Sequence, residues 1–320
     1  MENISSLDDI DLIFDALSSK NKNFYESHLY RQVKSFSPIY RDFIYKIINN
    51  KSLKIADAYN DGAIVSDADK DNKIRTKLTK KRKNKIYTDI RNVDILPHEL
   101  GHAVDFWFGK TLSLTKTVLI ENNQTLYEIF TQEFESKYQD LYQLVINEYK
   151  DIINSSISEN AFNILITNLP KYRELKSIKV NLKDKEVTSK RRKLQQELYD
   201  SSFVEIYYQL HEKKCYQTLN TKYCPILDAL SSKYDLSYLC LVHHKNDYYK
   251  ISKYLPVYEF FANVFGAEVT SKHCEFENLI KYLPKSFSAF EKLFAIVYDH
   301  IQNNKKFTDI PLKKASDKYE

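Results

Sequence analysis

Two histidines and a glutamate stand close together in residues 94–109, DILPHELGHAVDFWFG. The histidines are His98 and His102, and Glu99 directly follows the first of them. Residues four apart lie on one face of an α-helix, so both imidazoles can reach a single cation. Imidazole nitrogens bind zinc at about 2.0–2.1 Å, and the H-E-x-x-H spacing is typical of such sites. Glu99, turned by about 100° around the helix axis, can take a proton from a water beside the metal.

A catalytic zinc normally has three protein ligands, so the chain must supply one more. The extended metzincin pattern would place a histidine at position 108, which is Phe here. A carboxylate from a later helix is the alternative, and the acidic candidates are Glu128, Glu133, Glu135, Glu205, Glu259 and Glu268. Glu259 is the strongest of them because it borders the apolar stripe of YLPVYEFFANVFGAEV, where a buried carboxylate needs a partner.

The segments HELGHAVDF, EFFANVFGAEV and LPKSFSAFEKLF together resemble the catalytic domain of the anthrax lethal factor-like zinc metallopeptidases, which include the proline-proline endopeptidases. The resemblance covers residues 53–109 and 249–300, less than half of the chain. It implies a zinc endopeptidase in which His98, His102 and Glu259 bind one catalytic Zn²⁺. The resemblance also implies that Glu99 of this chain is the general base.

The chain departs from the family at two positions near the proposed ligands. Asn263 stands where the family has a carboxylate, and its amide could still orient His98 through a hydrogen bond. Ser252 stands where the family has a tyrosine that assists at the scissile carbonyl. Tyr254 and Tyr249 lie nearby, and each is a candidate for that role, with simple packing as the alternative.

Asp105 continues the helix face of His98 and His102 and is a candidate for supporting the ligands from behind. A surface carboxylate with no such role is the alternative. The interval between His102 and Glu259 is far longer than in the family. A large helical insertion between the two metal-binding helices is therefore predicted.

The fold predicted from these patterns is α+β but mostly helical, with a zincin-like metalloprotease core, a small sheet before the active-site helix and the helical insertion. Only 4 of the 320 residues are Gly and 7 are Pro, which favours helices over tight turns. The predicted parts are an N-terminal helical segment at 1–50, a core at 51–110 and 246–304, the insertion at 111–245 and a flexible tail at 305–320.

Alternating apolar and polar residues predict the small sheet. Residues 53–66 surround an Asn-Asp-Gly turn, typical of a hairpin, and further strands are expected at 74–78 and 85–90. The last of these is predicted to be a sheet edge that binds substrate peptide as an added strand through Ile86, Tyr87 and Thr88. The basic run at 73–85 is either a solvated hairpin tip or part of the substrate cleft. It lacks the interleaved aromatic residues that single-stranded nucleic acid needs, which argues against a nucleic-acid partner.

Cysteine spacing, the length of apolar runs and the charge of the N-terminus indicate in which compartment the protein is made. The four cysteines, at 215, 224, 240 and 274, form no close pair, so reduced thiols are expected. The sequence has no apolar run long enough to span a membrane. Its N-terminus is acidic, whereas the start of a secretory signal would be basic. We therefore expect a protein that is cytoplasmic as synthesised and that would need a dedicated route for export or delivery to a host cell.

The function expected from the motif and the resemblance is cleavage of a protein substrate by a zinc endopeptidase of the toxin or effector type. The first alternative is a catalytically weak or inactive member that acts as a binding or regulatory module. A regulatory protease of bacterial mobile elements, which also has an early H-E-x-x-H, is the second alternative. It usually lacks the EFFA helix found here. The sequence leaves the oligomeric state open.

Overall fold

The computed structural model describes residues 33–50, 54–57, 64–66, 85–88, 95–106, 113–154, 158–178, 184–212, 223, 225–234, 236, 246–271, 276–303 and 310–313. These residues divide between two compact units. The first unit contains residues 1–136 and 250–320, and the second contains residues 137–249.

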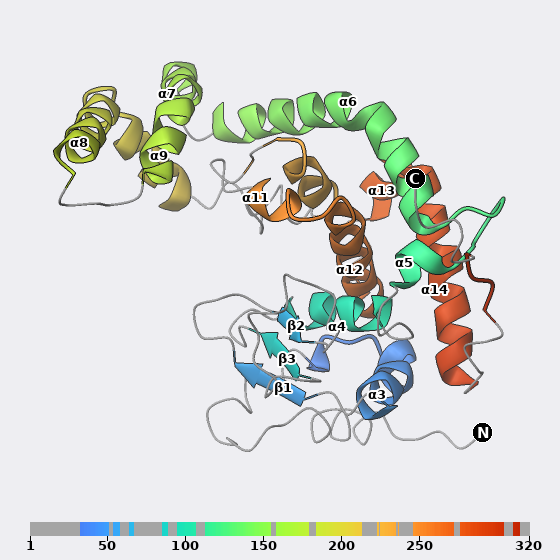
Figure 1. The fold of residues 1–320 in the computed structure, drawn as a ribbon. Helices are drawn as coiled ribbons and strands as arrows, with labels where there is room; N and C mark the ends of the chain where they lie inside the picture. The colour runs from blue at the N-terminus through green and yellow to red at the C-terminus, as the bar shows by residue number, and fades with distance from the viewer. Residues whose placement is uncertain are drawn as a thin grey trace. The chain divides into compact units, whose positions relative to one another are not determined.

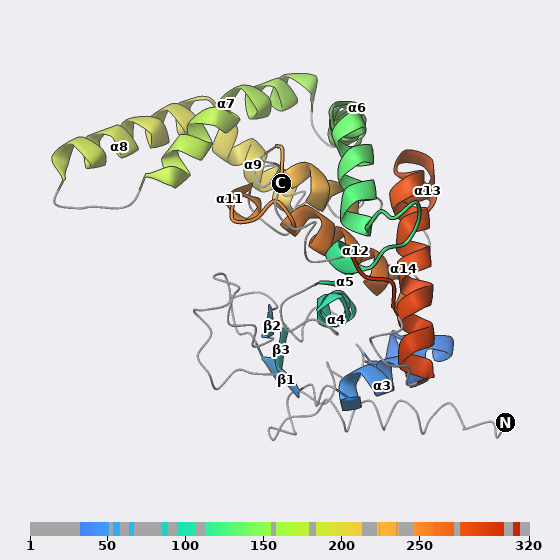
Figure 2. The same ribbon diagram turned by 45° about the vertical axis from the view of Figure 1, so that its right-hand side comes forward.

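The first unit contains the helices that position the candidate site (Figure 1). Its elements are η1 (Pro38–Tyr40), α3 (Arg41–Asn50), β1 (Lys54–Asp57), β2 (Ile64–Ser66), β3 (Lys85–Thr88), α4 (Ile95–Asp105), α5 (Leu114–Thr117), the start of α6 (Leu126–Asn154), α12 (Leu255–Val269), α13 (Phe276–Tyr282) and α14 (Pro284–Gln302). Figures 1 and 2 show α4 between α12 on one side and the short strands on the other.

Helix α12 is the central helix of the first unit. Twelve of its fifteen residues are buried, and they lie on all sides of the helix. A helix that is apolar all round belongs in the interior of a protein, and its neighbours α4, α5 and α14 cover it here. Pro256 stands in the first turn, where its missing N–H costs no hydrogen bond. Glu259 is therefore an acidic residue placed inside a hydrophobic core.

Buried polar contacts fix the elements around α12. Glu133 of α6 accepts hydrogen bonds from the backbone N–H of Ser286 at 2.8 Å and from its hydroxyl at 2.7 Å. This carboxylate therefore binds free N–H groups at the start of α14. Tyr40 of η1 donates a hydrogen bond to Glu268 of α12. Burial, followed by this hydrogen bond and the negative charge of Glu268, raises the pKa of the Tyr40 phenol.

The three strands form a sheet in the order β1-β3-β2. Strand β3 pairs with β1 in parallel and with β2 antiparallel, and Ile86 is opposite Ile55 in one pair and Val65 in the other. The predicted hairpin across Asn60-Asp61-Gly62 was wrong, because β3 lies between the two strands that it was expected to join. The turn residues themselves and the predicted strand at 74–78 lie outside the described residues.

The predicted fold class, α+β with a zincin-like core, was wrong. Among residues whose side chains the structure describes, 80% are helical and none lies in a strand. The strands are short pieces of three or four residues, defined by their backbone alone. The alternating pattern of residues 53–90 predicted a sheet, but long stretches of the sequence have helical periodicity and the chain has only 4 glycines, which favours helices. The described chain is therefore classed as helical.

The second unit is built from helices. Its elements are the rest of α6 together with α7 (Glu159–Ser177), α8 (Lys185–Asp200), α9 (Phe203–Glu212) and α11 (Asn246–Tyr249), and α7, α8 and α9 contact one another. Ser158 caps α7 by accepting from the N–H of Ala161, and Asp184 caps α8 in the same way. These caps satisfy backbone N–H groups in the first turns of α7 and α8.

The observed unit boundaries differ from the predicted ones. The predicted insertion at 111–245 corresponds to a unit at 137–249, so α5 and the first turns of α6 belong with the candidate site. Within the predicted tail at 305–320, residues 310–313 are described and make backbone hydrogen bonds. There, Leu119 donates its N–H to the carbonyl of Pro311, and Lys313 donates its N–H to Thr117. Residues 1–32, the basic run up to residue 84 and all four cysteines lie outside the described part.

No helix in the described residues is long and apolar enough to span a membrane.

Candidate metal centre

Helices α4 and α12 pack against each other at unusually short range, and two glycines permit it. A Cβ atom added at Gly101 of α4 would lie 2.7 Å from the Cα of Ala262 in α12. A Cβ atom added at Gly266 of α12 would lie 3.1 Å from the backbone nitrogen of His98 in α4. Because each glycine faces the backbone of the other helix, the side chains beside the glycines can meet.

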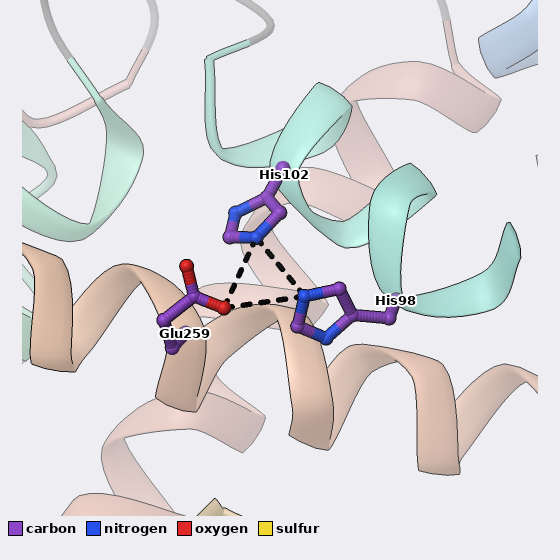
Figure 3. Close-up of side chains that lie close together, drawn as sticks. All are labelled: His98, His102 and Glu259. Carbon is purple, nitrogen blue, oxygen red and sulfur yellow. Dashed lines mark hydrogen bonds and ion pairs between the residues drawn. The ribbon is translucent and has the colours of Figure 1, made fainter. Parts of the chain in front are cut away.

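Three ligand atoms from these two helices converge on one point (Figure 3). His98 Nε2 lies 3.1 Å from His102 Nε2. Glu259 Oε2 lies 3.2 Å from His98 Nε2 and 3.4 Å from His102 Nε2. The residues form a group capable of holding a metal ion, and within the described part of the chain the group has three members.

These separations suit a zinc ion. Ligands bound at about 2.0–2.1 Å in tetrahedral geometry lie about 3.3–3.4 Å from one another. The observed 3.1, 3.2 and 3.4 Å are close to the edges of such a tetrahedron. Three protein ligands are also the usual number in a catalytic zinc site, whereas structural sites usually have four. The donor set and its spacing therefore fit a catalytic zinc ion.

Asn263 sets the orientation of the first imidazole. Its side-chain oxygen lies 2.7 Å from Nδ1 of His98. An amide oxygen can only accept, so Nδ1 of neutral His98 carries the proton and Nε2 presents its lone pair. In that tautomer the lone pair faces the Glu259 carboxylate at 3.2 Å, so a bound cation would lie between two electron-rich groups. The hydrogen bond expected between Asn263 and His98 is thus present in the structure.

Burial differs between the two sides of the centre. The Glu259 side chain is 1% exposed, while those of His98 and His102 are 18% and 13% exposed. The carboxylate is therefore held in a dry environment, where its negative charge attracts a cation more strongly than in water. The two histidine side chains are thus partly exposed, unlike the carboxylate. Glu99, adjacent to His98 on α4, is buried.

Asp105 has a role that the helix-face pattern did not reveal. It is fully buried, and its carboxylate accepts from the backbone N–H of Thr115 at 2.9 Å and from its hydroxyl at 3.2 Å. These contacts join the end of α4 to α5. Asp105 therefore positions α4 relative to its neighbour, three residues beyond His102.

The two candidate tyrosines occupy different units. Tyr249 lies in the second unit, where its buried hydroxyl donates to Asp228 at 3.0 Å, so this hydroxyl already has a structural partner. Tyr254 stands at the N-terminus of α12, and its ring packs against Tyr127 with centroids 4.7 Å apart. Lys116 lies over the same ring, 3.8 Å from its centroid.

The prediction that Ile86, Tyr87 and Thr88 form a sheet edge for substrate was wrong. These residues belong to β3, the central strand, which pairs with β1 on one side and β2 on the other. A strand paired on both sides has no free row of backbone groups for an added peptide. The sequence alone could not give the strand order, because that order depends on contacts between distant segments.

Gly266 is a functional position that the sequence reasoning missed. The glycine inside the apolar stretch EFFANVFGAEV was the signal that could have found it. A glycine in a helix interior costs about 1 kcal/mol relative to alanine and so calls for a packing reason. Here the reason is the backbone of α4.

Searches of family models, curated proteins and solved structures found no match to this chain.

Proposed function

We propose that this protein is a zinc-dependent endopeptidase. The observation that carries the proposal is the convergence of His98, His102 and Glu259 at separations that fit zinc. The three-ligand set and the partly exposed histidines favour a catalytic site over a structural one. The choice of a peptide bond as substrate rests on the H-E-x-x-H spacing and on the resemblance to the anthrax lethal factor-like metallopeptidases. That resemblance also suggests a toxin or effector.

Each residue of the centre has a distinct part in this proposal. A bound zinc ion would supply Lewis acidity, polarising a carbonyl and favouring ionisation of water near neutral pH. Glu99 takes the proton of the attacking water and passes it to the leaving amine. Asn263 keeps the proton of His98 on Nδ1, so that Nε2 remains available as a ligand.

Metal content and proteolysis test the proposal together. The wild-type chain should contain close to one equivalent of zinc and should cleave peptides from a mixed library, with cleavage lost on adding a chelator and restored by zinc. Glu259→Ala should lose both the metal and the cleavage. Glu99→Gln should keep the metal and lose cleavage, since it removes only the proton acceptor. Full turnover by Glu99→Gln would contradict the assignment.

A non-catalytic metal-binding module is the second candidate, and the tyrosine contacts favour it. The Tyr249 hydroxyl donates to Asp228 in the second unit, so it is already committed to a structural hydrogen bond and not to a reacting carbonyl. This candidate predicts zinc in the wild type with no cleavage of any library peptide. The same digestion experiment separates the two functions.

A further inference from the structure

Residues 310–313 pair with the chain at the end of α5, and we call them the C-terminal strap. Lys313 donates its N–H to the carbonyl of Thr117 at 2.8 Å, and Leu119 donates its N–H to the carbonyl of Pro311 at 2.9 Å. The two segments run antiparallel. The strap therefore holds the end of α5 by backbone hydrogen bonds from a distant part of the chain.

Side chains fasten the strap at both of its ends. Ile310, at one end, is 5% exposed. At the other end, the ammonium of Lys313 donates to the carboxylate of Glu128 at 2.6 Å, in the first turn of α6. A buried apolar side chain and an ion pair thus hold the strap where its backbone meets α5.

Helix α5 carries the contact from the strap to α4. Thr117, whose carbonyl accepts from the strap, donates its hydroxyl to the carbonyl of Ser113 at 2.7 Å. The Ser113 hydroxyl lies 3.1 Å from that of Thr115, which in turn donates to Asp105. All four residues are buried, and α5 contacts both α4 and α12. A line of buried hydrogen bonds therefore runs from the strap to the last residue of α4.

This line ends one turn beyond a candidate metal ligand. His102 stands in the last turn of α4, and Asp105 follows it at i+3 on the same helix face. Helix ends fray, and a negative charge at a helix C-terminus is opposed by the helix dipole. Contacts from outside the helix, such as those of Asp105 with Thr115, are needed to hold this turn. His98 lies near the start of α4 and is oriented by Asn263 instead.

We propose that the C-terminal strap and Thr115 position the metal centre: by fixing α5, the strap fixes the last turn of α4 and with it the imidazole of His102. Metal affinity is then controlled by a segment outside both ligand-bearing helices. Because such coupling is reciprocal, metal binding also tightens the strap. This inference rests on the metal site of the proposed function and adds the part of the chain that regulates its affinity.

Two buried threonines of α5 provide a matched test. Valine has nearly the shape of threonine but lacks the hydroxyl, so Thr115→Val removes a bond to α4, whereas Thr117→Val removes one within α5. Zinc competition with a chromophoric chelator on the full-length chain should show about a fivefold weaker affinity for Thr115→Val. Thr117→Val should stay within about twofold of the wild type, and Thr115→Ser, which keeps the hydroxyl, should restore the affinity.

The free energy of unfolding separates positioning from general stability. Both valine variants lose one buried hydrogen bond and should lose similar stability in urea. A purely structural role would therefore lower zinc affinity equally in both variants, or in neither. Either result would overturn the proposal.

The strap itself is tested at Lys313. Lys313→Pro removes the N–H that pairs with Thr117, and Lys313→Gln removes only the charge that pairs with Glu128. Zinc affinity should fall by about fivefold in the proline variant and change little in the glutamine variant. Unchanged affinity in a folded Lys313→Pro chain would contradict a role for the strap.

Hydrogen exchange of the wild-type chain tests the reverse direction without any substitution. Zinc should slow exchange of the Lys313 and Leu119 amides, measured by NMR against a chelator-treated sample. Amides of α3 are the control, because α3 belongs to the same unit but not to this line of hydrogen bonds. Strap amides that respond to zinc no more than those of α3 would overturn the coupling.

Failure of this inference is distinguishable from failure of the proposed function. Zinc binding and cleavage by the wild type, with equal affinities for the two valine variants, would remove the positioning role and leave the endopeptidase. A selective loss of affinity in Thr115→Val, with no cleavage by the wild type, would do the reverse. A wild type that binds no zinc would overturn both.

Discussion

At the scale of single residues, the candidate centre contains an amide, Asn263, beside its three proposed ligands. Asn263 is a neutral hydrogen-bond partner for His98, in contrast to a carboxylate at this position. A neutral acceptor fixes the tautomer of the imidazole, but it raises the basicity of the ring less than a carboxylate would. The His98–Asn263 pair therefore controls orientation first and ligand basicity second.

Replacing Asn263 by Leu tests this role. The change removes the acceptor at Nδ1 of His98, so zinc affinity should fall by about 10- to 100-fold while the fold is kept. Asn263→Asp, which restores an acceptor, should bind zinc at least as well as the wild type. Competition with a chromophoric chelator gives the affinities. The control is Asn168→Leu, because Asn168 is a buried asparagine in α7 of the second unit; a similar loss there would mean that the effect is not local.

At the scale of the helices, two glycines determine whether the ligands can meet. Gly101→Ala would place a methyl group 2.7 Å from the Cα of Ala262, a distance that real Cβ atoms do not tolerate. An unstrained Gly→Ala change in a helix stabilises a protein by about 0.4–1 kcal/mol. Overpacking costs about 1–3 kcal/mol, so the loss should outweigh the gain.

Gly101→Ala is therefore expected to lower both the free energy of unfolding and zinc affinity. Gly266→Ala should have a smaller effect on both, because its Cβ atom would meet its nearest neighbour at 3.1 Å. Chemical denaturation and zinc titration of both variants measure the two effects. If Gly266→Ala were the more damaging, the close approach at Gly101 would not be what sets the helix spacing.

The start of α6 offers a prediction with a pH dependence. Thr125 and Glu128 cap each other: the Glu128 carboxylate accepts from the Thr125 N–H at 2.9 Å, and the Thr125 hydroxyl accepts from the Glu128 N–H at 3.3 Å. Burial alone would raise the pKa of Glu128. Hydrogen bonds from Lys313 and Thr125 outweigh burial, so the pKa is lowered from 4.5.

A lowered pKa means that the Glu128 carboxylate stabilises the fold at pH values above 4.5, and that this stability is lost as the pH falls through the lower folded value. Glu128→Gln should therefore cost about 0.5–1 kcal/mol at neutral pH and progressively less in acid. Urea unfolding across this range measures the difference. Glu121→Gln, which removes an exposed ion pair with Lys292, is the control and should change stability little. A pH-independent loss in Glu128→Gln would show that the charge has no part.

At the scale of the whole molecule, zinc should stabilise one unit and not the other. All three proposed ligands belong to the first unit, while α7, α8 and α9 belong to the second. A ligand that binds only the folded state stabilises the part that it binds, by about 2.7 kcal/mol at a hundredfold excess over its dissociation constant. The two units are thus expected to respond differently to the metal.

Hydrogen exchange of the full chain, with zinc and with a chelator, tests this expectation. Peptides from α4 and α12 should exchange more slowly with zinc, and peptides from α7 and α8 should be unchanged. In Glu259→Ala the zinc effect should disappear from both helices. Equal protection of both units would show that the metal acts on the molecule as a single cooperative body.

Much of the candidate site was accessible from local spacing. His98, Glu99 and His102 form one helical turn, and a glutamate within an apolar stripe indicated Glu259, because a buried carboxylate requires a partner. The sequence could not place Asp105, whose partner Thr115 comes from the next helix. It also could not place Tyr249, whose hydroxyl is bonded to Asp228.

The amino-acid sequence by itself determined which residues share a helix face and which carboxylate had to be buried, since both follow from helix periodicity and side-chain polarity. Tertiary structure decided the rest. The order β1-β3-β2 excluded β3 as an edge, and the backbone contact at Gly101 brought α4 against α12. The tail residues 310–313 were fixed by pairing with residues 117–119. Each of these outcomes depends on contacts between residues far apart in the chain, and the local sequence does not say which distant segments meet.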